Sequence, residues 1–401
     1  MNVRVIDIRN IEEAKARIKS IGADEYSVPL MAKKAVLKAL LIEKLDNRAA
    51  NFIKQDMLSI GGEAAVSREV GNLKRGSSSL LVTGTLKQLE ALCDKIQFQP
   101  FGLKETAKGI KKALLNDGKR DFLLKFGPKG KSIKLGKTPA VMGVLNVTPD
   151  SFSDGGKYLD SSFALDRAYK MAEDGADMID IGGESTRPGA GKVSAAEELA
   201  RVIPVIKKLS RKINIPISID TYKPEVATAA IDAGAGMIND VTGMRSGGRK
   251  MAALAAKHKL PVVLMHMQGT PRTMQKSPRY NNVIAEILDF FEERIAFAAD
   301  NGIDPENIVI DPGIGFGKTL ADNILILRQL REFKALGRPV MIGTSRKSFI
   351  GRLTGIEEPT ERLSGSLASI IWCAVNGADI LRVHDVKDTV NAVKVIQTIQ
   401  K

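Results

Sequence analysis

Residues 139–156 read PAVMGVLNVTPDSFSDGG, a short apolar run that leads directly into a segment rich in polar residues and glycine. Near-continuous apolar runs are typical of strands that are buried on both faces of a parallel sheet. The same unit occurs eight times, in the runs Ala140–Val147, Met178–Gly182, Ile215–Asp220, Met237–Val241, Pro261–His266, Asn307–Asp311, Pro339–Gly343 and Ile380–His384. Amphipathic helical patterns separate the runs, among them Ala195–Ile213, Val283–Ala299, Asn323–Leu336 and Leu363–Val375.

The alternation of buried strands and helices predicts an α/β fold in which helices cover a parallel sheet. Eight units within about 260 residues match the (β/α)8 TIM barrel, which typically takes about 250 residues. An open, doubly wound sheet is the alternative, but eight near-equal units without an interruption favour a closed barrel. The sequence therefore predicts a TIM-barrel domain over residues 138–401.

Residues 1–130 have a different pattern, which predicts an additional N-terminal α+β domain. Its predicted elements are helices at Ile11–Ile21, Leu30–Leu45, Leu86–Asp94 and Glu105–Asn116, and a strand at Ser79–Thr83. The sequence GPKGK at residues 127–131 predicts a linker between the two domains. The region carries no motif that assigns it a function.

The composition is that of an ordinary globular protein, with 44% hydrophobic and 26% charged residues. The net charge of +14 lies almost entirely in residues 1–137, which carry +12, whereas the rest of the chain carries +2. This distribution favours a solvated basic surface, and a nucleic-acid-binding scaffold is the alternative. The two cysteines, Cys93 and Cys373, have no ligand-like spacing, and no apolar run reaches membrane length, so we expect a cytoplasmic protein.

In a TIM barrel, catalytic groups come from the C-terminal ends of the strands and from the loops that follow them. The polar residues at these positions are Asn146, Glu184, Asp220, Asn239, Asp240, His266, Asp311, Lys347, Arg382 and His384. Because eight separate segments each deliver such a residue, the sequence predicts an active site at this rim.

The last strand and the first one suggest an anion site. Arg382 and His384 are two residues apart and therefore point to the same side of their strand, and Asn146 ends the neighbouring strand of a closed barrel. An arginine, a histidine and an amide that converge there are suited to phosphate. Asn146 and Asp154 could also hold a Mg²⁺ that bridges phosphate oxygens.

Four other strand ends suggest a second subsite for a planar heterocycle. Asp220, Asn239, Asp311 and Lys347 offer carboxylates, an amide and a cation. A carboxylate can accept two N–H bonds from an aminopyrimidinone edge while a lysine donates to ring oxygen and nitrogen. A further motif, GIGFGKT at residues 313–319, ends like a nucleotide-binding P-loop, but Pro312 stands where that motif requires glycine, so we do not predict a nucleotide site.

Taken together, residues 139–401 resemble the dihydropteroate synthases. The motifs that carry the resemblance are, in chain order, GVLNVTPDSFSDGG, DIGGESTRPGA, PISIDT, IND, LMHMQGTP, DPGIGFGK, GTSRKSFIG and RVHDV. The resemblance implies a Mg²⁺-dependent transferase of folate synthesis, inhibited by sulfonamides, that condenses 6-hydroxymethyl-7,8-dihydropterin pyrophosphate with p-aminobenzoate. It also implies a homodimer.

The family's residue roles carry over by position. The resemblance assigns the pterin ring to Asp220, Asn239, Asp311 and Lys347, the pyrophosphate to Asn146, Arg382 and His384, and the p-aminobenzoate pocket to Phe152, Asp154, Thr186, Arg187, Pro188, Phe316 and Ser348. Among these, Asp220, Lys347 and Arg382 are the expected catalytic residues. A pterin-dependent methyltransferase is the alternative enzyme, although such an enzyme needs no pyrophosphate site.

Overall fold

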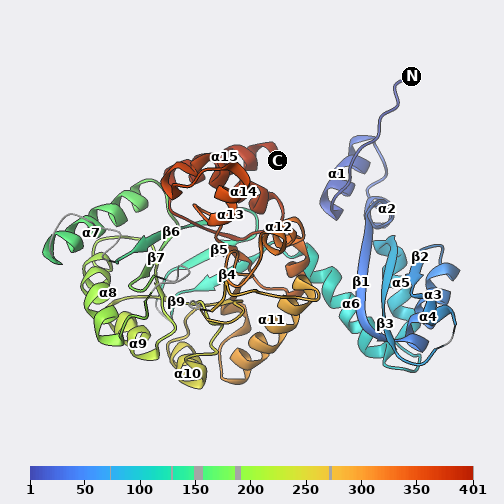
Figure 1. Ribbon diagram of the computed structural model, residues 1–401. Coiled ribbons are helices and arrows are strands. Elements are labelled where there is room, and N and C mark those ends of the chain that lie inside the picture. The colour runs from blue at the N-terminus through green and yellow to red at the C-terminus, as the bar shows by residue number, and fades with distance from the viewer. Residues whose placement is uncertain (73, 128–129, 149–156, 186–190, 271–272, 401) are drawn as a thin grey trace. The chain divides into compact units, whose positions relative to one another are not determined.

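The computed structural model describes residues 1–400 except 73, 128–129, 149–156, 186–190 and 271–272. The chain forms two compact units, Met1–Gly118 and Lys119–Lys401 (Figure 1). The boundary between them therefore falls earlier in the chain than the linker expected at residues 127–131.

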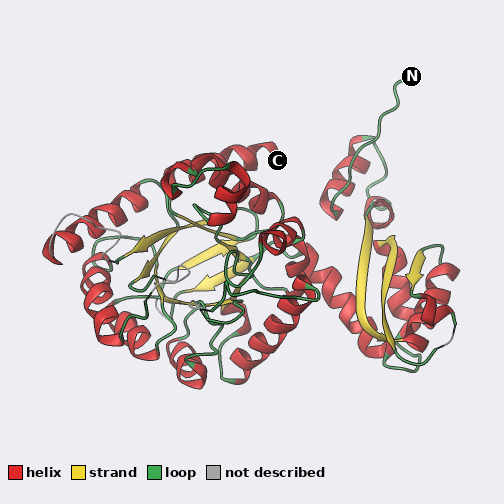
Figure 2. Cartoon of the chain, in the orientation of Figure 1, coloured by secondary structure: helices red, strands yellow, loops and turns green. Residues whose placement is uncertain are grey.

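The second unit is an eight-stranded parallel barrel covered by helices (Figure 2). Its strands are β6 (Ala140–Asn146), β7 (Met178–Gly182), β8 (Ile217–Asp220), β9 (Met237–Asp240), β10 (Val262–Met265), β11 (Ile308–Asp311), β12 (Met341–Ile342) and β13 (Ile380–Val383). The sheet runs in the order β11-β10-β9-β8-β7-β6-β13-β12, and a parallel bridge between Ile310 and Val340 joins its two ends. The predicted TIM barrel is confirmed.

The helices of this unit follow the strands in alternation. They are α7 (Lys157–Glu173), α8 (Ala195–Leu209), α9 (Pro224–Ala233), α10 (Gly248–His258), α11 (Val283–Asp300), α12 (Leu320–Arg328), α13 (Ser348–Thr354), α14 (Leu363–Val375) and α15 (Val386–Gln400), with 3-10 turns η2 (Pro305–Asn307), η3 (Leu330–Leu336) and η4 (Pro359–Glu361). The helix expected over Asn323–Leu336 is divided into α12 and η3, because the backbone leaves the helical region at Gln329.

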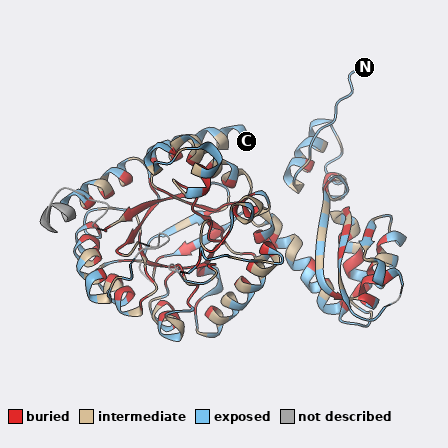
Figure 3. Cartoon of the chain, in the orientation of Figure 1, coloured by how far each residue is buried: buried red, intermediate tan, exposed pale blue. Residues whose placement is uncertain are grey.

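Side chains alternate along the strands between the helix layer and the barrel interior, and the barrel strands are mostly buried (Figure 3). Outward-facing residues such as Ile179 and Leu381 pack against the helices in the main core. Inward-facing residues near the start of the strands form a separate apolar cluster, which contains Ala140, Met142, Met178, Met237, Val263, Val309, Met341 and Ile380.

A short antiparallel hairpin completes this cluster and closes the N-terminal end of the barrel. Strands β4 (Phe122–Lys125) and β5 (Ser132–Leu135) contribute Phe122, Leu124 and Leu135, all buried. The prediction of a linker at residues 127–131 is wrong, because Lys125 before it and Ser132 after it pair with each other in the hairpin. Residues 128–129 themselves lie outside the described residues. The apolar strand starts need a cover against water, and the hairpin provides it.

The first unit is α+β, as expected, with a three-stranded antiparallel sheet in the order β1-β3-β2. Its elements are α1 (Ile11–Ser20), α2 (Val28–Ala35), β1 (Leu37–Asp46), α3 (Asn47–Ser59), β2 (Glu63–Val66), α4 (Arg68–Gly71), β3 (Ser77–Thr85), α5 (Leu86–Ile96) and α6 (Leu103–Gly118). The helix expected over Leu30–Leu45 is wrong beyond Ala35, because the rest of it pairs with β3. Among the described residues of the whole chain, no helix is both long and apolar enough to span a membrane.

Candidate active site at the mouth of the barrel

In several strands the inward-facing side chains change from apolar to polar or charged in the second half of the strand. The residues at these positions are Asp180 on β7, Asp220 on β8, Asn239 on β9, Asp311 on β11 and Arg382 on β13. The pairing register places Gly182 of β7 beside Asp220, and Asp220 beside Asn239. The parallel strands therefore bring these polar groups together at one mouth of the barrel, which the sequence predicts for all of them except Asp180.

Arg382 is the centre of an ionic network at this mouth. Its Nε donates to Asp180 Oδ2 at 2.7 Å, and its Nη2 donates to Asp220 Oδ2 at 2.8 Å. Asn239 Nδ2 donates to the same Asp180 oxygen at 2.9 Å. Burial raises the pKa of Asp220, the Asp180 carboxylate adds to the rise, and the Arg382 guanidinium opposes it. The network fixes the guanidinium and carboxylates before any ligand arrives.

Lys347 and Asp311 lie on another part of the mouth. The Lys347 ammonium donates to the carbonyl of Ile314 and lies 4.9 Å from the centroid of the Phe316 ring. Asp311 Oδ1 accepts a hydrogen bond from Gly313 N at 2.7 Å. Burial lowers the pKa of Lys347 to about 8, against the opposite effect of the Asp311 carboxylate. Burial likewise raises the pKa of Asp311.

Asn146 and Asp220 direct oxygens over Gly182, which has no side chain to block them. A Cβ on Gly182 would lie 3.8 Å from Asn146 Oδ1 and 3.6 Å from Asp220 Oδ2. Amide and carboxylate oxygens are ligands that Mg²⁺ accepts, together with water and substrate phosphate. The donor chemistry at this position therefore fits a magnesium ion. Among the described residues, there is no group of three or more His, Cys, Asp or Glu side chains that could hold a metal by itself.

His384 directly follows β13, two residues after Arg382. Its backbone N–H and its Nδ1 both lie 3.2 Å from the hydroxyl of Ser345. Burial lowers the pKa of His384 to about 3, and the nearby Arg382 and Arg346 guanidinium groups contribute. His384 is therefore a neutral hydrogen-bonding group, and the positive charge beside it comes from Arg382.

Of the residues expected to form the p-aminobenzoate pocket, the structure describes Phe316 and Ser348. Phe316 is half-buried beside Lys347, and Ser348 is the exposed first residue of α13. The remaining expected residues lie outside the described residues, namely Phe152, Asp154, Thr186, Arg187 and Pro188.

Three strand-end residues do not point into the mouth. Asp240 shares the outward face of β9 with Ile238, and its Oδ1 accepts hydrogen bonds from Thr242 N and Oγ1, each at 2.7 Å. The His266 ring packs edge-on against Phe290 of α11. Glu184 lies just after β7, where its carboxylate contacts Lys223. The period of two along a strand sends Asp240 and His266 to the helix side.

Two residues at the site were missed by the sequence analysis. Asp180 holds both Arg382 and Asn239, and its position in the middle of a buried strand, two residues after Met178, is the signal that could have identified it. Lys318 is 3% exposed and lies 2.9 Å from His266 Nδ1 through its ammonium. It belongs to the motif that was set aside as an imperfect P-loop.

The fold and the site together define a (β/α)8-barrel enzyme whose mouth holds a polar small molecule between fixed charges. The sequence profile of the pterin binding enzymes matches residues 142–384, and the chain belongs to this family.

Two relatives show how far the similarity extends. The dihydropteroate synthase of Escherichia coli is 48% identical over 274 residues, which are 68% of this chain and 96% of that protein. A probable bifunctional folylpolyglutamate synthase/dihydropteroate synthase of Halobacterium salinarum is 38% identical over 392 residues, which are 98% of this chain but 46% of that protein. The second alignment extends into the N-terminal unit, so that unit has a counterpart in the haloarchaeal protein.

Solved structures of relatives match the barrel. The dihydropteroate synthase of Xanthomonas albilineans with 4-aminobenzoic acid is 48% identical, with a TM-score of 0.65 over 70% of this chain and 98% of that one. The Yersinia pestis dihydropteroate synthase, in a complex with a sulfonamide drug, is 44% identical, with a TM-score of 0.64 over 68% of this chain and 97% of that one.

Proposed function

We propose that this protein is a dihydropteroate synthase. It condenses 6-hydroxymethyl-7,8-dihydropterin pyrophosphate with p-aminobenzoate and releases 7,8-dihydropteroate and pyrophosphate, a transferase step of folate synthesis. The observation that carries the proposal is that polar groups suited to a pterin ring and a cation suited to pyrophosphate converge at one mouth of the barrel. The chain is also 48% identical to a synthase over nearly that synthase's whole length.

The pterin ring binds among Asp220, Asn239, Asp311 and Lys347. The carboxylate of Asp311 accepts N–H bonds from the aminopyrimidinone edge, and Lys347 donates to ring oxygen and nitrogen. Asp311 is 5% exposed and Asn239 is 2% exposed, so these groups exchange few hydrogen bonds with bulk water. A ligand that satisfies such buried polar groups is strongly preferred over one that leaves them unpaired.

The pyrophosphate binds beside Arg382, His384 and Asn146. Arg382 supplies the positive charge, and the neutral ring of His384 supplies a hydrogen-bonding group. The amide oxygen of Asn146 faces the space above Gly182. Asn146, with Asp154, would hold Mg²⁺ there. When bound, Mg²⁺ supplies additional positive charge to the leaving pyrophosphate.

The reaction needs no protein nucleophile. The bond between the pterin methylene carbon and the pyrophosphate oxygen breaks, and its electron pair leaves with the pyrophosphate. The positive charge that develops on the methylene is delocalised into the pterin ring and lies near the Asp220 carboxylate. The aniline nitrogen of p-aminobenzoate then donates its lone pair to the methylene carbon and loses a proton to solvent.

The amine substrate binds against Phe316 and Ser348. Phe316 offers an apolar face for the benzene ring, and the exposed Ser348 hydroxyl offers a donor for the carboxylate. Phe152, Thr186, Arg187 and Pro188 complete this pocket in the proposal. A sulfonamide, which has the same aromatic amine, competes for it.

Turnover of the two substrates by the full-length chain tests the proposed function directly. We expect dihydropteroate and pyrophosphate in equal amounts, inhibition by a sulfonamide, and loss of turnover with a chelator that Mg²⁺ restores. Absence of product under these conditions would overturn the assignment. Positional isotope exchange in the pyrophosphate without p-aminobenzoate tests whether the leaving group departs first.

The methyltransferase alternative has no supporting observation, because the relatives described above are named as synthases.

A homodimer is supported by exposed apolar side chains on the last helices of the barrel. Leu353 on α13 is 58% exposed and Trp372 on α14 is 51% exposed. Sedimentation equilibrium tests it. A cytoplasmic location is consistent with the two unpaired, buried cysteines.

A further inference from the structure

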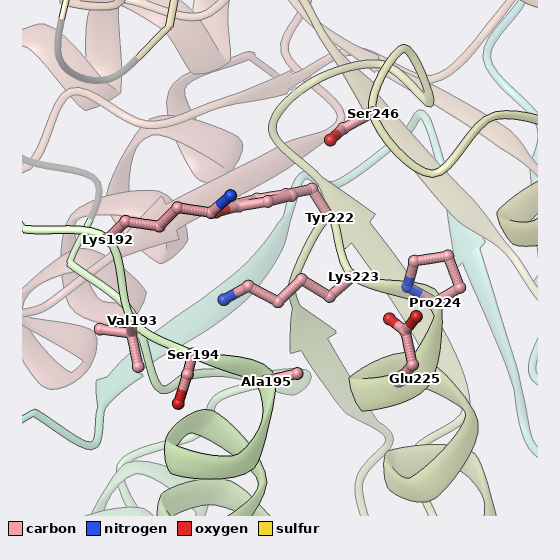
Figure 4. A pocket seen from close by; sticks show the side chains of 9 residues that line it. All are labelled: Lys192, Val193, Ser194, Ala195, Tyr222, Lys223, Pro224, Glu225 and Ser246. Atoms are coloured by element: carbon pink, nitrogen blue, oxygen red, sulfur yellow. The ribbon is translucent and has the colours of Figure 1, made fainter.

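An ion pair at the rim of the barrel joins the loop after β12 to the loop after β13. Its members are Arg346, which directly precedes Lys347, and Asp385, which directly follows His384. Another ionic group lies after β8, where Lys223 lines a cavity of about 380 Å³ (Figure 4) and pairs with two carboxylates. The pair of Arg346 and Asp385 is distinguished by its neighbours in sequence, both of which we assign to the pterin pyrophosphate.

The Arg346 side chain holds Asp385 through two hydrogen bonds. Its Nε donates to Asp385 Oδ2 at 3.1 Å, and its Nη2 donates to Asp385 Oδ1. The two side chains are 25% and 15% exposed, so the pair is only partly open to solvent. A guanidinium that binds both oxygens of a carboxylate has a defined orientation relative to it. The pair therefore fixes the loop after β12 against the loop after β13.

The backbone of Arg346 has a conformation that a long side chain disfavours. Its φ is 60°, in the left-handed region, where residues other than glycine are strained. The backbone is bonded on both sides, since Arg346 N donates to Ser366 Oγ at 2.9 Å and Arg346 O accepts from Arg362 Nη1 at 3.1 Å. Ser366 lies in α14 and Arg362 directly before it, and both are buried. Such strain persists only where the surrounding contacts determine it, and it is common at functional sites.

This turn has a contact to a proposed subsite on either side of Arg346. Ser345, directly before it, places its hydroxyl 3.2 Å from both the backbone N–H and the Nδ1 of His384, which belongs to the pyrophosphate subsite. Lys347, directly after it, donates from its ammonium to the carbonyl of Ile314 and belongs to the pterin subsite. One strained turn therefore connects the groups that bind the two halves of a single substrate.

We infer that Arg346, paired with Asp385, is a positioning residue that holds the pterin subsite and the pyrophosphate subsite in one arrangement. The inference rests on the proposed function and deepens it, because neither residue is among those expected to contact substrate. Loss of the pair would release the loop that carries His384 from the loop that carries Lys347. Both halves of the pterin pyrophosphate would then bind more weakly.

Equilibrium titrations with each half of the substrate test the inference without turnover. The probes are 6-hydroxymethylpterin for the ring and inorganic pyrophosphate with Mg²⁺ for the leaving group. We expect Arg346→Met and Asp385→Asn each to raise the Kd of both probes by about tenfold. Ser345→Ala should raise the Kd of pyrophosphate alone, because it removes the contact to His384 and leaves the ion pair intact.

Two further variants show whether the pair acts as a unit and guard against poor folding. The effects of Arg346→Met and Asp385→Asn should not add, so the double variant should bind each probe as Arg346→Met does. Effects that multiply would show that the two side chains act separately, and the inference would be wrong. Arg346→Gly adopts the left-handed conformation without strain and still lacks the pair, so it should fold and lose the same affinity. Full affinity in this variant would also overturn the inference.

Arg338 provides a matched control, because it lies just before β12 whereas Arg346 lies after it. Its Nη1 donates to the carbonyl of Pro305 at 2.8 Å, and its side chain is 18% exposed. Arg338→Met should lower thermal stability and leave both Kd values within about twofold. If Arg346→Met and Asp385→Asn do the same, the inference is wrong. A wild-type chain that binds both probes and forms no dihydropteroate would overturn the proposed function alone.

Discussion

The two ends of the barrel interior are built by the same strands and differ in almost every other respect. At the N-terminal end, Met178 and Ile380 belong to a cluster of apolar side chains that the β4–β5 hairpin covers. Two residues further along the same strands stand Asp180 and Arg382, which form an ion pair. One end is filled and stable, and the other is charged and open to ligand.

The charged end of the barrel interior contains destabilising features that the apolar end lacks. Asp180 Oδ1 and Asn239 Oδ1 are buried at the charged end without a hydrogen-bond partner. A buried polar atom left unpaired costs about 1–3 kcal/mol. The apolar end, with its close-packed side chains, offsets this cost. We therefore expect substitutions at the two ends to separate activity from stability.

The largest effect is expected at the charged end, from Arg382→Met. This change removes the partner of both Asp180 and Asp220 and should lower kcat/KM about 10³-fold. It should also destabilise the fold by about 3–5 kcal/mol, because two buried carboxylates lose their cation. Steady-state kinetics and urea unfolding measure the two effects.

A second variant separates the two effects of that change. Addition of Asp180→Asn to Arg382→Met removes one of the uncompensated charges and should recover part of the stability but none of the activity. Recovery of activity by the double variant would show that Arg382 acts only through folding, and the contrast between the two ends would be lost.

The second prediction concerns the apolar end. Phe122→Ala removes a buried ring from the hairpin and should cost about 3–5 kcal/mol of unfolding free energy, while both KM values and kcat stay unchanged below the melting temperature. The neighbouring Leu123, which faces solvent, provides the control, since Leu123→Ala should change stability by less than about 0.5 kcal/mol. A selective loss of kcat in Phe122→Ala would contradict the separation.

The contrast also explains what the sequence could predict. The strands were found because apolar runs repeat, and the C-terminal half of each run had to face one mouth. The hairpin was missed because its strands are only four residues each and flank a GPKG sequence that resembles a linker. Strand β1 was predicted as helix because its apolar residues also fit a helical period, and only its pairing with β3 decides between them.

At the site, the sequence indicated Asp220, Asp311 and Arg382 because they end their strands. Asp180 was missed because it lies inside an apolar run, and only the period of two along β7 reveals that it shares the interior with Met178. Lys318 was missed because its partners, the carbonyls of Phe316 and His266, are brought together by the fold.

The third prediction tests this buried lysine, which supports the charged end from outside. Lys318 donates to the Phe316 carbonyl at 3.0 Å and so holds the turn that carries the proposed p-aminobenzoate wall. Lys318→Met should raise KM for p-aminobenzoate by roughly threefold to tenfold. Kinetics at fixed saturating pterin pyrophosphate measure it, and an unchanged KM would remove Lys318 from the site.

The same variant also tests how Lys318 contributes to the free energy of unfolding as the pH changes. Burial lowers the pKa of Lys318 to about 7 from the ordinary value of 10.5. Between these values the unfolded chain binds more protons than the folded one, so the contribution of Lys318 to stability rises with pH. Wild type should gain up to about 1.4 kcal/mol per pH unit over Lys318→Met between pH 7 and 9, measured by urea unfolding.

The last prediction concerns the protonation of the half-buried His384 ring at the charged end. Burial lowers the pKa of His384 to about 3, so its ring should stay neutral in the folded protein from pH 8 down to pH 5. Its ¹⁵N chemical shifts should therefore not titrate over that range.

The unfolded chain does protonate this histidine below its ordinary pKa of 6.5, so its contribution to stability is lost as the pH falls through that value. Wild type should thus lose stability relative to His384→Asn by up to about 1.4 kcal/mol per pH unit below pH 6.5. A titration of His384 near pH 6.5 in the folded protein would mean that the mouth gains a second cation in acid, and pyrophosphate affinity would then rise as the pH falls.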